Sequence, residues 1–427
     1  MIRAEARLIL EGGRSRMPGQ SPARIHSRAS LLAALLVACS GEATAPPASE
    51  PEGRRLSVGE TTACAIHSSA QIYCWGDNSS YMEFGEPVPG KFFVPEPYAV
   101  QLTNVASFAA GSSSHMCGIT PAGSALCWGR DTFGQVGSGA PGVGGSPPAV
   151  VAGDVSWSDI VVGRIHTCGV SISGDGYCWG SNFAGEIGNA SVPLGTSSHA
   201  PVPIDGSLRF MTVAAGWRHA CGVTSDGSVY CWGENTVGQL GRGAADSTFH
   251  RTPAVVASTE RFVALSLGGR HTCGLTTDGR ALCWGENWAG QLGDGTAAPR
   301  SVPTPVAGGH RFRSISTSSG FAGGTGLNTS TQAQLAHTCA LTDDGTPYCW
   351  GWNAVGQVGN GSTAQLQPTP VLVSRGLRLD ELGTGGGYTC GRRGDALWCW
   401  GANARGQLGN GGIGNSAVPV PVAAPFN

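Results

Sequence analysis

The cysteines of this chain recur at regular intervals. Fourteen of the fifteen fall into seven pairs, and successive pairs begin about fifty residues apart over most of the chain. Self-similarity at a fixed period of this length is typical of an array of identical supersecondary units. The sequence therefore predicts a single repeat array. The seven pairs are Cys64–Cys74, Cys117–Cys127, Cys168–Cys178, Cys221–Cys231, Cys273–Cys283, Cys339–Cys349 and Cys390–Cys399.

The fourth repeat shows how each unit is expected to fold. Residues 210–215 are short and apolar, residues 219–224 and 228–233 are predicted strands on either side of an Asp-Gly turn, and a Pro-rich segment ends in a fourth strand. Gly is abundant, with 68 residues, and charged residues make up only 13%, which suits short strands joined by tight turns. Seven such units predict an all-β fold, a seven-bladed β-propeller over residues 56–427.

The hairpin turn predicts which cysteines bond. Cys221 and Cys231 are ten positions apart, and a three-residue loop with Gly227 in the left-handed conformation makes them direct cross-strand neighbours. In the last repeat the spacing from Cys390 to Cys399 is nine, and a glycine-first two-residue turn keeps this pair opposite as well. Directly opposed residues lie within disulfide range. We therefore expect seven disulfides and an oxidising, extracytoplasmic compartment.

A histidine stands two residues before the first cysteine in five repeats, which raises metal binding as an alternative. His-x-Cys with the paired cysteine supplies three ligands, whereas structural zinc takes four, and the first and last repeats have Thr62 and Tyr388 at this position. We therefore expect no metal and no other cofactor, and structural histidines that bond to neighbouring backbone. These histidines are His115, His166, His219, His271 and His337.

The two ends of the chain suggest how the ring closes. The first repeat begins at about Leu56 without the Pro-Val-rich strand that precedes every other copy. The chain ends in such a strand, residues 417–422, with no repeat after it. We therefore expect the C-terminal strand to join the first blade and to fasten the circle.

Residues 1–38 are predicted to be an export signal of the lipoprotein type. An apolar run at residues 29–38 follows basic residues and is too short to span a bilayer. The stretch before it is long for such a signal, and Met17 would make a more ordinary start. A plain secretory signal cleaved elsewhere is the alternative.

Cys39 is the fifteenth cysteine and directly follows this run. Residues 36–39, Leu-Val-Ala-Cys, resemble the lipobox of bacterial lipoproteins, in which the peptidase cleaves before a cysteine that carries the lipid. Residues 39–55 contain no large apolar side chain until the propeller begins, which predicts a disordered tether. We expect a protein anchored by Cys39 to a bacterial membrane, at the cell surface or in the periplasm.

A motif that begins at each second cysteine carries a family resemblance. Cys-Trp-Gly-x-Asn-x-x-Gly-Gln-Leu-Gly stands in full at residues 231–241, 283–293 and 399–409, with weaker copies at 127–135 and 178–186. Together with the preceding Gly-x-x-His, it resembles the repeat of the regulator of chromosome condensation family. The resemblance covers nearly everything from Leu56 onward and implies the propeller fold.

Two members of that family differ in function. The eukaryotic namesake is a nuclear nucleotide-exchange factor for a small GTPase that also binds chromatin, and a secreted bacterial relative inhibits β-lactamases. The resemblance, together with the export signal, suggests an exported lipoprotein member in the same propeller class as the secreted inhibitors. None of the exchange-active positions can be matched, so none is carried over.

Charge and motifs narrow the function further. A net charge of −2 without runs of Lys or Arg disfavours a nucleic-acid partner. The chain has no Gly-x-Ser-x-Gly, phosphate-cradling loop or His-Glu-x-x-His, and its acidic residues occur chiefly in hairpin turns, so we expect no catalytic residues and no enzyme. We expect a monomeric, non-enzymatic scaffold that binds another protein. The alternatives are a guanine-nucleotide exchange regulator of a GTPase, which requires a cytosolic location, and a glycan-binding propeller.

One rim of the ring is the expected binding surface. In an antiparallel blade the first and third strands end on the same face, so the Gly-x-x-His and Trp-Gly-x-Asn loops share a rim. Trp and Arg are enriched among interface hot spots, although such rings can also pack between blades. About fourteen extra residues near 318–336 extend this rim as a binding loop or a tolerated bulge. The candidate partner-binding residues are Phe133, Arg164, Phe183, Trp217, Arg218, Arg270, Trp288, Trp352 and Arg405.

Overall fold

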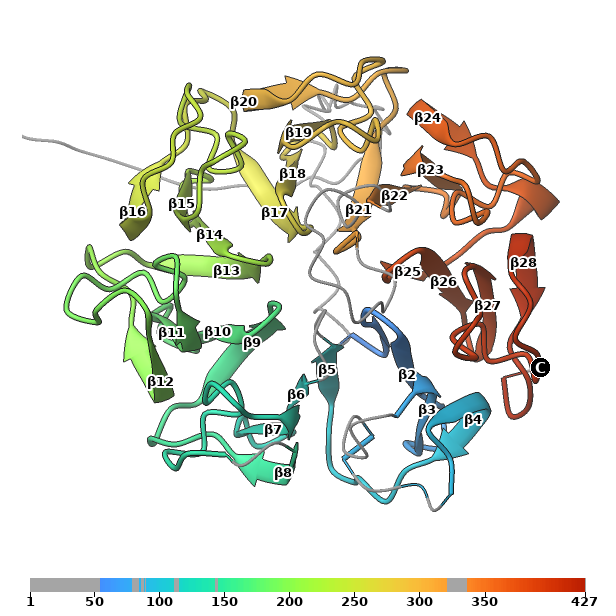
Figure 1. Cartoon of the computed structure of the whole chain (residues 1–427), viewed down its shortest axis with the longest axis horizontal. Helices are drawn as coiled ribbons and strands as arrows, with labels where there is room; N and C mark the ends of the chain where they lie inside the picture. The colour runs from blue at the N-terminus through green and yellow to red at the C-terminus, as the bar shows by residue number, and fades with distance from the viewer. Residues whose placement is uncertain are drawn as a thin grey trace, which may run out of the picture. The chain divides into compact units, whose positions relative to one another are not determined.

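Seven four-stranded antiparallel sheets surround a central axis in the computed structural model, as the blades of a β-propeller (Figure 1). This arrangement confirms the predicted fold class. Among the described residues no helix is long and apolar enough to cross a membrane. The predicted signal, Cys39, most of the predicted tether and most of the insertion near 318–336 lie outside these residues. The structure describes residues 54–78, 84–85, 88, 90–110, 115–142, 145–320 and 336–426.

Each blade is a contiguous stretch of chain whose strands pair in sequence order. Blades one to three contain β1 (Leu56–Val58), β2 (Thr62–Ile66), β3 (Ile72–Asp77), β4 (Phe93–Ala99), β5 (Ser107–Ala110), β6 (His115–Ile119), β7 (Ala125–Arg130), β8 (Gly145–Val150), β9 (Trp157–Val162), β10 (His166–Ser171), β11 (Gly176–Asn182) and β12 (Thr196–Pro203). Blades four and five contain β13 (Phe210–Ala215), β14 (His219–Thr224), β15 (Val229–Gly233), β16 (His250–Val255), β17 (Phe262–Leu267), β18 (His271–Thr276), β19 (Ala281–Gly285) and β20 (Arg300–Pro305). Blades six and seven contain β21 (Phe312–Thr317), β22 (His337–Thr342), β23 (Pro347–Trp352), β24 (Leu366–Leu372), the 3-10 turn η2 (Ser374–Gly376), β25 (Glu381–Thr384), β26 (Tyr388–Arg393), β27 (Ala396–Gly401) and β28 (Ser416–Pro421).

The cysteine pairs lie opposite each other on the second and third strands of every blade. All seven predicted disulfides are present. In blade four Gly227 has a φ of 79°, the left-handed value that its three-residue loop requires. In blade seven Arg393 pairs with Ala396 across a two-residue turn, and Gly394 has a φ of 59°. The lost residue therefore falls in the turn and leaves the register of the strands unchanged.

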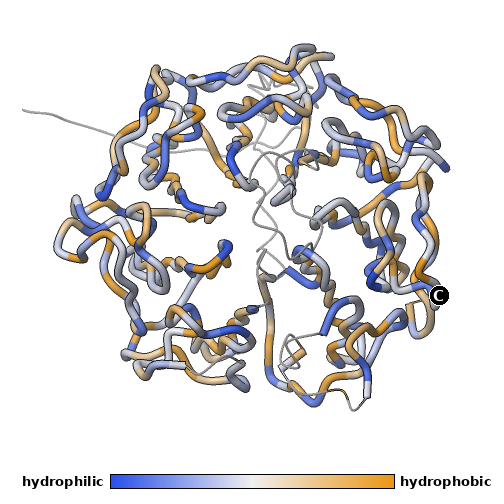
Figure 2. The backbone as a smooth tube through the Cα atoms, viewed as in Figure 1, coloured by the Kyte–Doolittle hydropathy of each residue, from blue (hydrophilic) through white to orange (hydrophobic). Residues whose placement is uncertain are grey.

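The core is divided into seven clusters, each lying between two neighbouring blades. Trp232 of blade four, for example, is fully buried in the same cluster as Cys168 and Cys178 of blade three, and its indole donates to the Glu186 carbonyl at 2.8 Å. Apolar and polar stretches accordingly alternate in all seven blades (Figure 2). The tryptophan that follows each second cysteine therefore ties its blade to the one before it.

The predicted ring closure is wrong. β28 pairs with β27 inside blade seven, and β4 completes blade one without it. Each Pro-rich strand is the fourth strand of the blade whose first three strands come before it in the chain. In blade one this strand is β4, so the outer edge of that blade is already occupied. Blades seven and one meet through side chains instead: Trp75 donates to the Gln407 carbonyl at 3.0 Å, as Trp232 does to Glu186.

The first described residues take part in this closure. The backbone amides of Arg55 and Leu56 donate to the Glu381 carboxylate of blade seven at 3.1 and 2.8 Å. The Arg55 guanidinium also donates to the His67 carbonyl at 2.8 Å. Arg55, which the sequence places in the tether, is therefore bonded to the propeller.

Candidate functional site

The loops after the first and third strands of each blade lie at the same end of the ring. In blade four, His219 pairs with Gly233 at this end, and Val223 pairs with Val229 at the other. We call the end at which the histidines begin the second strands the His rim, and the opposite end the hairpin rim. The Gly-x-x-His and Trp-Gly-x-Asn loops therefore share the His rim, as expected from the strand directions.

Two candidate residues meet at the His rim between blades three and four. The guanidinium carbon of Arg164 lies 4.8 Å from the centroid of the Trp217 ring, within the range of a cation–π contact. The Arg164 amide donates to the Gly216 carbonyl at 3.1 Å, which holds the two loops together. Burial lowers the pKa of Arg164, and the negative charge of Glu60 opposes that effect. Arg218, next to Trp217, is exposed.

A second arginine and tryptophan meet on blade five, where it adjoins blade four. Arg270 lies 3.2 Å from the Glu286 carboxylate and 3.5 Å from the Glu234 carboxylate, and its guanidinium donates to the Thr236 hydroxyl at 2.7 Å. The ring of Trp288, which is 53% exposed, has its centroid 5.9 Å from the guanidinium carbon. Burial raises the pKa of Glu286 to about 7, although Arg270 opposes this shift. Arg270 is thus paired with two carboxylates within the protein.

The remaining candidates are spread around the rim. Phe133 and Phe183 pack edge to face with ring centroids 5.2 Å apart. Arg405 forms an ion pair with Asp77 across the closure of the ring, and its guanidinium lies 5.2 Å from the Phe93 ring.

Trp352, the last candidate, ends β23 in blade six and is half-buried. It pairs with Leu366 of β24. The structure thus joins six of the nine candidates in three pairs, places Arg218 beside one of these pairs, and leaves Trp352 and Arg405 on separate blades.

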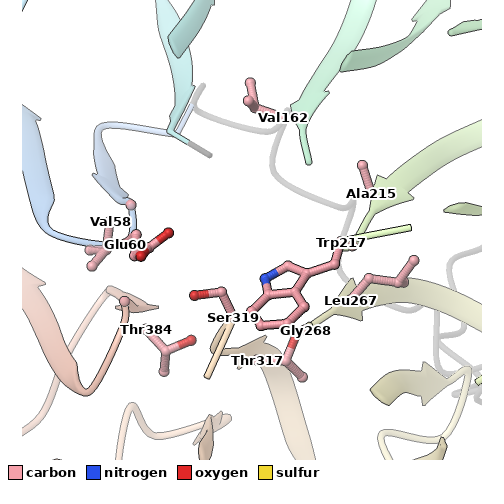
Figure 3. Close-up of a pocket in the computed structure, with 13 residues that line it drawn as sticks. Val58, Glu60, Val162, Ala215, Trp217, Leu267, Gly268, Thr317, Ser319 and Thr384 are labelled. Atoms are coloured by element: carbon pink, nitrogen blue, oxygen red, sulfur yellow. The ribbon is translucent and has the colours of Figure 1, made fainter. Parts of the chain in front are cut away.

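A pocket of about 70 Å³ lies at the His-rim end of the central channel (Figure 3). The Glu60 carboxylate and the Trp217 ring enter it from opposite sides, and Ser319 lies beside the indole. A larger cavity of about 420 Å³ is lined by the first strands of blades one to seven. Sequence reasoning missed Glu60, because Thr62 stands where five other repeats have the histidine that marks this loop.

The histidines are structural and have a more specific partner than expected. His219 of blade four lies 3.0 Å from the Thr272 hydroxyl of blade five. That hydroxyl donates to the Gln239 carbonyl of blade four at 3.0 Å, and the same carbonyl accepts the Trp284 indole. Burial lowers the pKa of His219 to about 3, so the ring is neutral and donates through Nε2. We call this His–Thr–carbonyl chain the relay.

We call the interface between two neighbouring blades a joint. Four of the joints contain the relay. His115, His271 and His337 face their threonines at 3.0, 3.2 and 2.8 Å. At these joints the threonine is contributed by the following blade. The threonines are Thr167, Thr338 and Thr389. The sequence predicts histidines that bond directly to neighbouring backbone. At these joints they bond instead to a threonine hydroxyl, and that hydroxyl bonds to a backbone carbonyl.

The joint between blades three and four lacks the relay. Ala220 stands where the next blade has Thr272, and neither ring nitrogen of His166 bonds to any described residue. Burial lowers the pKa of His166 to about 4. Glu186 replaces the glutamine of the motif, and its Oε1 atom likewise has no hydrogen bond within the described chain. Burial raises the pKa of Glu186 to about 7.

The carboxylates of the hairpin rim have a turn-forming role. Asp226 accepts hydrogen bonds from the Thr224 and Ser228 hydroxyls at 2.6 and 2.7 Å, and these bonds lower its pKa to about 2. Asp278 and Asp344 have equivalent threonine bonds. In the part of the chain that the structure describes, no group of three His, Cys, Asp or Glu side chains is placed to hold a metal ion.

Comparison with known families matches almost the whole chain. The RCC1-like domain matches residues 41–391, and the regulator of chromosome condensation (RCC1) repeat matches residues 395–427. The ultraviolet-B receptor UVR8 of Arabidopsis thaliana is 30% identical over 310 residues, which cover 71% of this chain and 65% of the receptor. The human E3 ubiquitin-protein ligase HERC2 is 30% identical over 236 residues, which cover 53% of this chain and 4% of the ligase. The chain thus spans less than two thirds of both relatives.

Solved structures show the same propeller. Prp20p of Saccharomyces cerevisiae superposes with a TM-score of 0.70 at 19% identity and covers 87% of this chain and 88% of its own. Human WBSCR16 has a TM-score of 0.68 at 20% identity and covers 79% of this chain and 87% of its own. At these identities the likeness extends to the fold alone.

Proposed function

Because this chain belongs to the RCC1-like family of propellers, we propose that it is a non-enzymatic scaffold that binds another protein through its His rim. The observation that carries the proposal is the arrangement of Arg164, Trp217 and Arg218 at one point of that rim. Tryptophan and arginine dominate binding energy in protein interfaces, particularly where a ring and a guanidinium stack. The similarity to UVR8 and HERC2 supports a regulatory or binding role for the propeller.

The proposal places the protein outside the cytoplasm, anchored to a membrane through a lipid on Cys39. Seven disulfides support an oxidising compartment, because cytosolic thiols are kept reduced. The lipobox-like Leu-Val-Ala-Cys before the propeller supports the anchor. An exchange factor for a GTPase would have to work in the cytosol, where these disulfides are disfavoured.

A capture experiment tests the rim. The purified full chain is immobilised and exposed to the extracytoplasmic fraction of its own cells, and retained proteins are identified by mass spectrometry. A Trp217→Ala/Arg218→Ala variant should lose the retained partner. Arg209→Ala is the matched control, since Arg209 is exposed and pairs with Asp175 on the hairpin rim. Equal capture by both variants would place the binding surface elsewhere, and an absence of any specific capture would refute the scaffold.

A further inference from the structure

Two arginines occupy the same loop position in neighbouring blades but have different surroundings. Arg218 precedes His219 in blade four, and Arg270 precedes His271 in blade five. Arg270 is held between Glu286 of its own blade and Glu234 of the blade before it. Arg218 is exposed and forms no ion pair with any described residue.

The sequence of blade three accounts for this difference. Glu234 and Glu286 occupy the variable position of Trp-Gly-x-Asn, and blade three has Ser181 there. Arg218 therefore lacks the carboxylate that the preceding blade supplies to Arg270. Glu234, of its own blade, is directed to Arg270 instead.

Glu186 is a carboxylate close enough to interact with Arg218. It is fully buried, and the positive charge of Arg218 lowers its pKa, but burial outweighs this effect and raises the value to about 7. Burial therefore favours the neutral form of this carboxyl group. The charge of Arg218 is only partly compensated within the protein.

Two more arginines join Arg218 in this sector of the rim. Arg130 ends β7 at the position where blade four has Glu234, and it is exposed and in no ion pair with the described chain. Arg164 lies between them, stacked on Trp217, and both Arg130 and Arg218 lower its pKa through their charge. The sector formed by Arg130, Arg164, Trp217 and Arg218, here called the cationic sector, thus combines three guanidinium groups with one indole.

From this comparison we propose that the partner presents a short acidic polypeptide segment whose carboxylates bind Arg218 and Arg130, with an apolar contact on Trp217. This inference rests on the proposed function and specifies the chemistry of its partner. Guanidinium groups bind planar carboxylates through paired hydrogen bonds, and Arg164, stacked on the Trp217 ring, adds a third positive charge beside the two that bind. An excess of uncompensated positive charge also accelerates the approach of an acidic partner.

The surface fits a short acidic segment better than an extended polyanion. The cationic sector lies on blades two to four, whereas Arg270 and Arg405 elsewhere on the same rim are paired with Glu286 and Asp77. A nucleic acid needs a continuous basic track to release its counterions, and the net charge of the chain is −2. A short segment with a few carboxylates can contact the cationic sector without lying over the glutamates on neighbouring parts of the rim.

Fluorescence anisotropy of a labelled peptide tests this proposal. The probe is a peptide with four consecutive glutamates between Gly-Ser flanks, and its all-glutamine analogue and a single-stranded oligonucleotide of equal charge are the comparison probes. The purified full chain should bind the glutamate peptide in preference to both, and the affinity should fall as salt is raised from about 50 to about 300 mM. Arg218→Ala should weaken binding by about tenfold, and Arg218→Glu should abolish it.

Control variants make the outcomes distinct. Arg209→Glu changes the same charge on the hairpin rim and should leave peptide binding unchanged. Thermal unfolding of each variant shows that it remains folded. Unchanged binding by Arg218→Glu, equal binding of the oligonucleotide, or a salt-sensitive dimer of the chain that forms through this sector would each overturn the proposal.

The capture experiment distinguishes failure of the acidic-partner inference from failure of the proposed scaffold function. If the Trp217→Ala/Arg218→Ala variant loses its partner but the captured complex survives high salt and Arg218→Glu, the scaffold stands and the acidic partner is wrong. If nothing is captured through the His rim, the scaffold itself fails.

Discussion

The joint between blades four and five has a hydrogen-bonded relay that the joint between blades three and four lacks. At the first, His219, Thr272 and the Gln239 carbonyl are linked by bonds of 3.0 Å. At the second, Ala220 removes the hydroxyl and leaves the buried His166 without a partner in the described chain. Both joints keep the buried tryptophan and the disulfide, and both bring the blades together in the same way.

The difference shows which parts of the repeat are needed for architecture. Packing of the tryptophan against the preceding blade is common to both joints, so it positions the blades, whereas the relay adds polar bonds to an interface already formed. An unsatisfied buried imidazole is costly, so the joint between blades three and four is expected to be the weaker one. That joint also lies beneath the stacked Arg164 and Trp217 of the cationic sector.

Removal of the shared element should have the largest effect. Trp232→Ala deletes a fully buried ring, together with its bond to the Glu186 carbonyl. Large-to-small substitutions of this kind cost about 3–5 kcal/mol, so we expect a loss of that size in the free energy of unfolding measured with guanidinium under oxidising conditions. Trp288→Ala is the matched control on the rim, and it should change stability by less than about 0.5 kcal/mol. Similar losses for both would contradict the assignment of Trp232 to the joint.

Removal of the relay should have a smaller effect. Thr272→Val keeps the shape of the side chain but takes away the hydroxyl that connects His219 to the Gln239 carbonyl. Leaving a buried donor without a partner costs about 1–3 kcal/mol, and we expect a lower guanidinium midpoint by a corresponding amount. An unchanged midpoint would show that the relay contributes nothing to the joint.

Glu186→Gln should stabilise the weaker joint in a pH-dependent way. Burial raises the pKa of Glu186 from its ordinary value of 4.5 to about 7, so between these values the folded protein binds more protons than the unfolded chain. The stability that Glu186 contributes therefore falls as pH rises from 4.5 to 7. We expect the glutamine variant to exceed the wild type by up to about 3 kcal/mol at pH 8 and to match it near pH 4.5.

The reciprocal change provides the control for this effect. Gln239→Glu places a carboxylate at the same position of the joint between blades four and five and should introduce the same loss of stability above pH 7. Unfolding curves recorded from pH 4.5 to 8 measure both variants. A glutamine variant whose advantage is the same at every pH would contradict a titrating Glu186.

Building the relay into the weaker joint should have the smallest effect. Ala220→Thr places a hydroxyl opposite His166, as Thr272 is placed opposite His219. A net hydrogen bond contributes about 0.5–1.5 kcal/mol, and we expect a gain in the free energy of unfolding within that range. A loss of stability would mean that the backbone at this joint has closed around alanine and leaves no room for the side chain.

Much of the fold follows from the sequence because disulfides and turns impose local geometry. The spacing of Cys221 and Cys231, and its shortening in the last repeat, are sufficient to place the strands and their register. Ring closure does not follow in this way. A periodic sequence has no mark that separates one blade from the next, so the Pro-rich strand at residues 417–422 fits either the last blade or the first. Only the pairing of β28 with β27 decides between them.

The candidate site was predicted in outline only. The aromatic and arginine residues of the rim stand out because they interrupt small and polar loops, but the carboxylates beside them do not. Glu234 and Glu286 occupy a variable position, and their role depends on the arginine of a neighbouring blade. Glu186 could have been recognised, because it replaces a glutamine that five other repeats retain. Arg218 has no carboxylate from the preceding blade because Ser181 stands at that position, and this relation could be recognised only in the three-dimensional arrangement.

If the propeller works outside the cytoplasm, as proposed, its disulfides must be formed in the cell that makes it. The intact mass of the native protein, extracted from membranes and alkylated with and without prior reduction, tests this requirement most directly. We expect a chain that begins at a lipidated Cys39 and in which the fourteen paired cysteines react only after reduction. Fourteen thiols that react without reduction, on a chain that retains residues 1–38, would contradict it and favour a cytosolic exchange regulator.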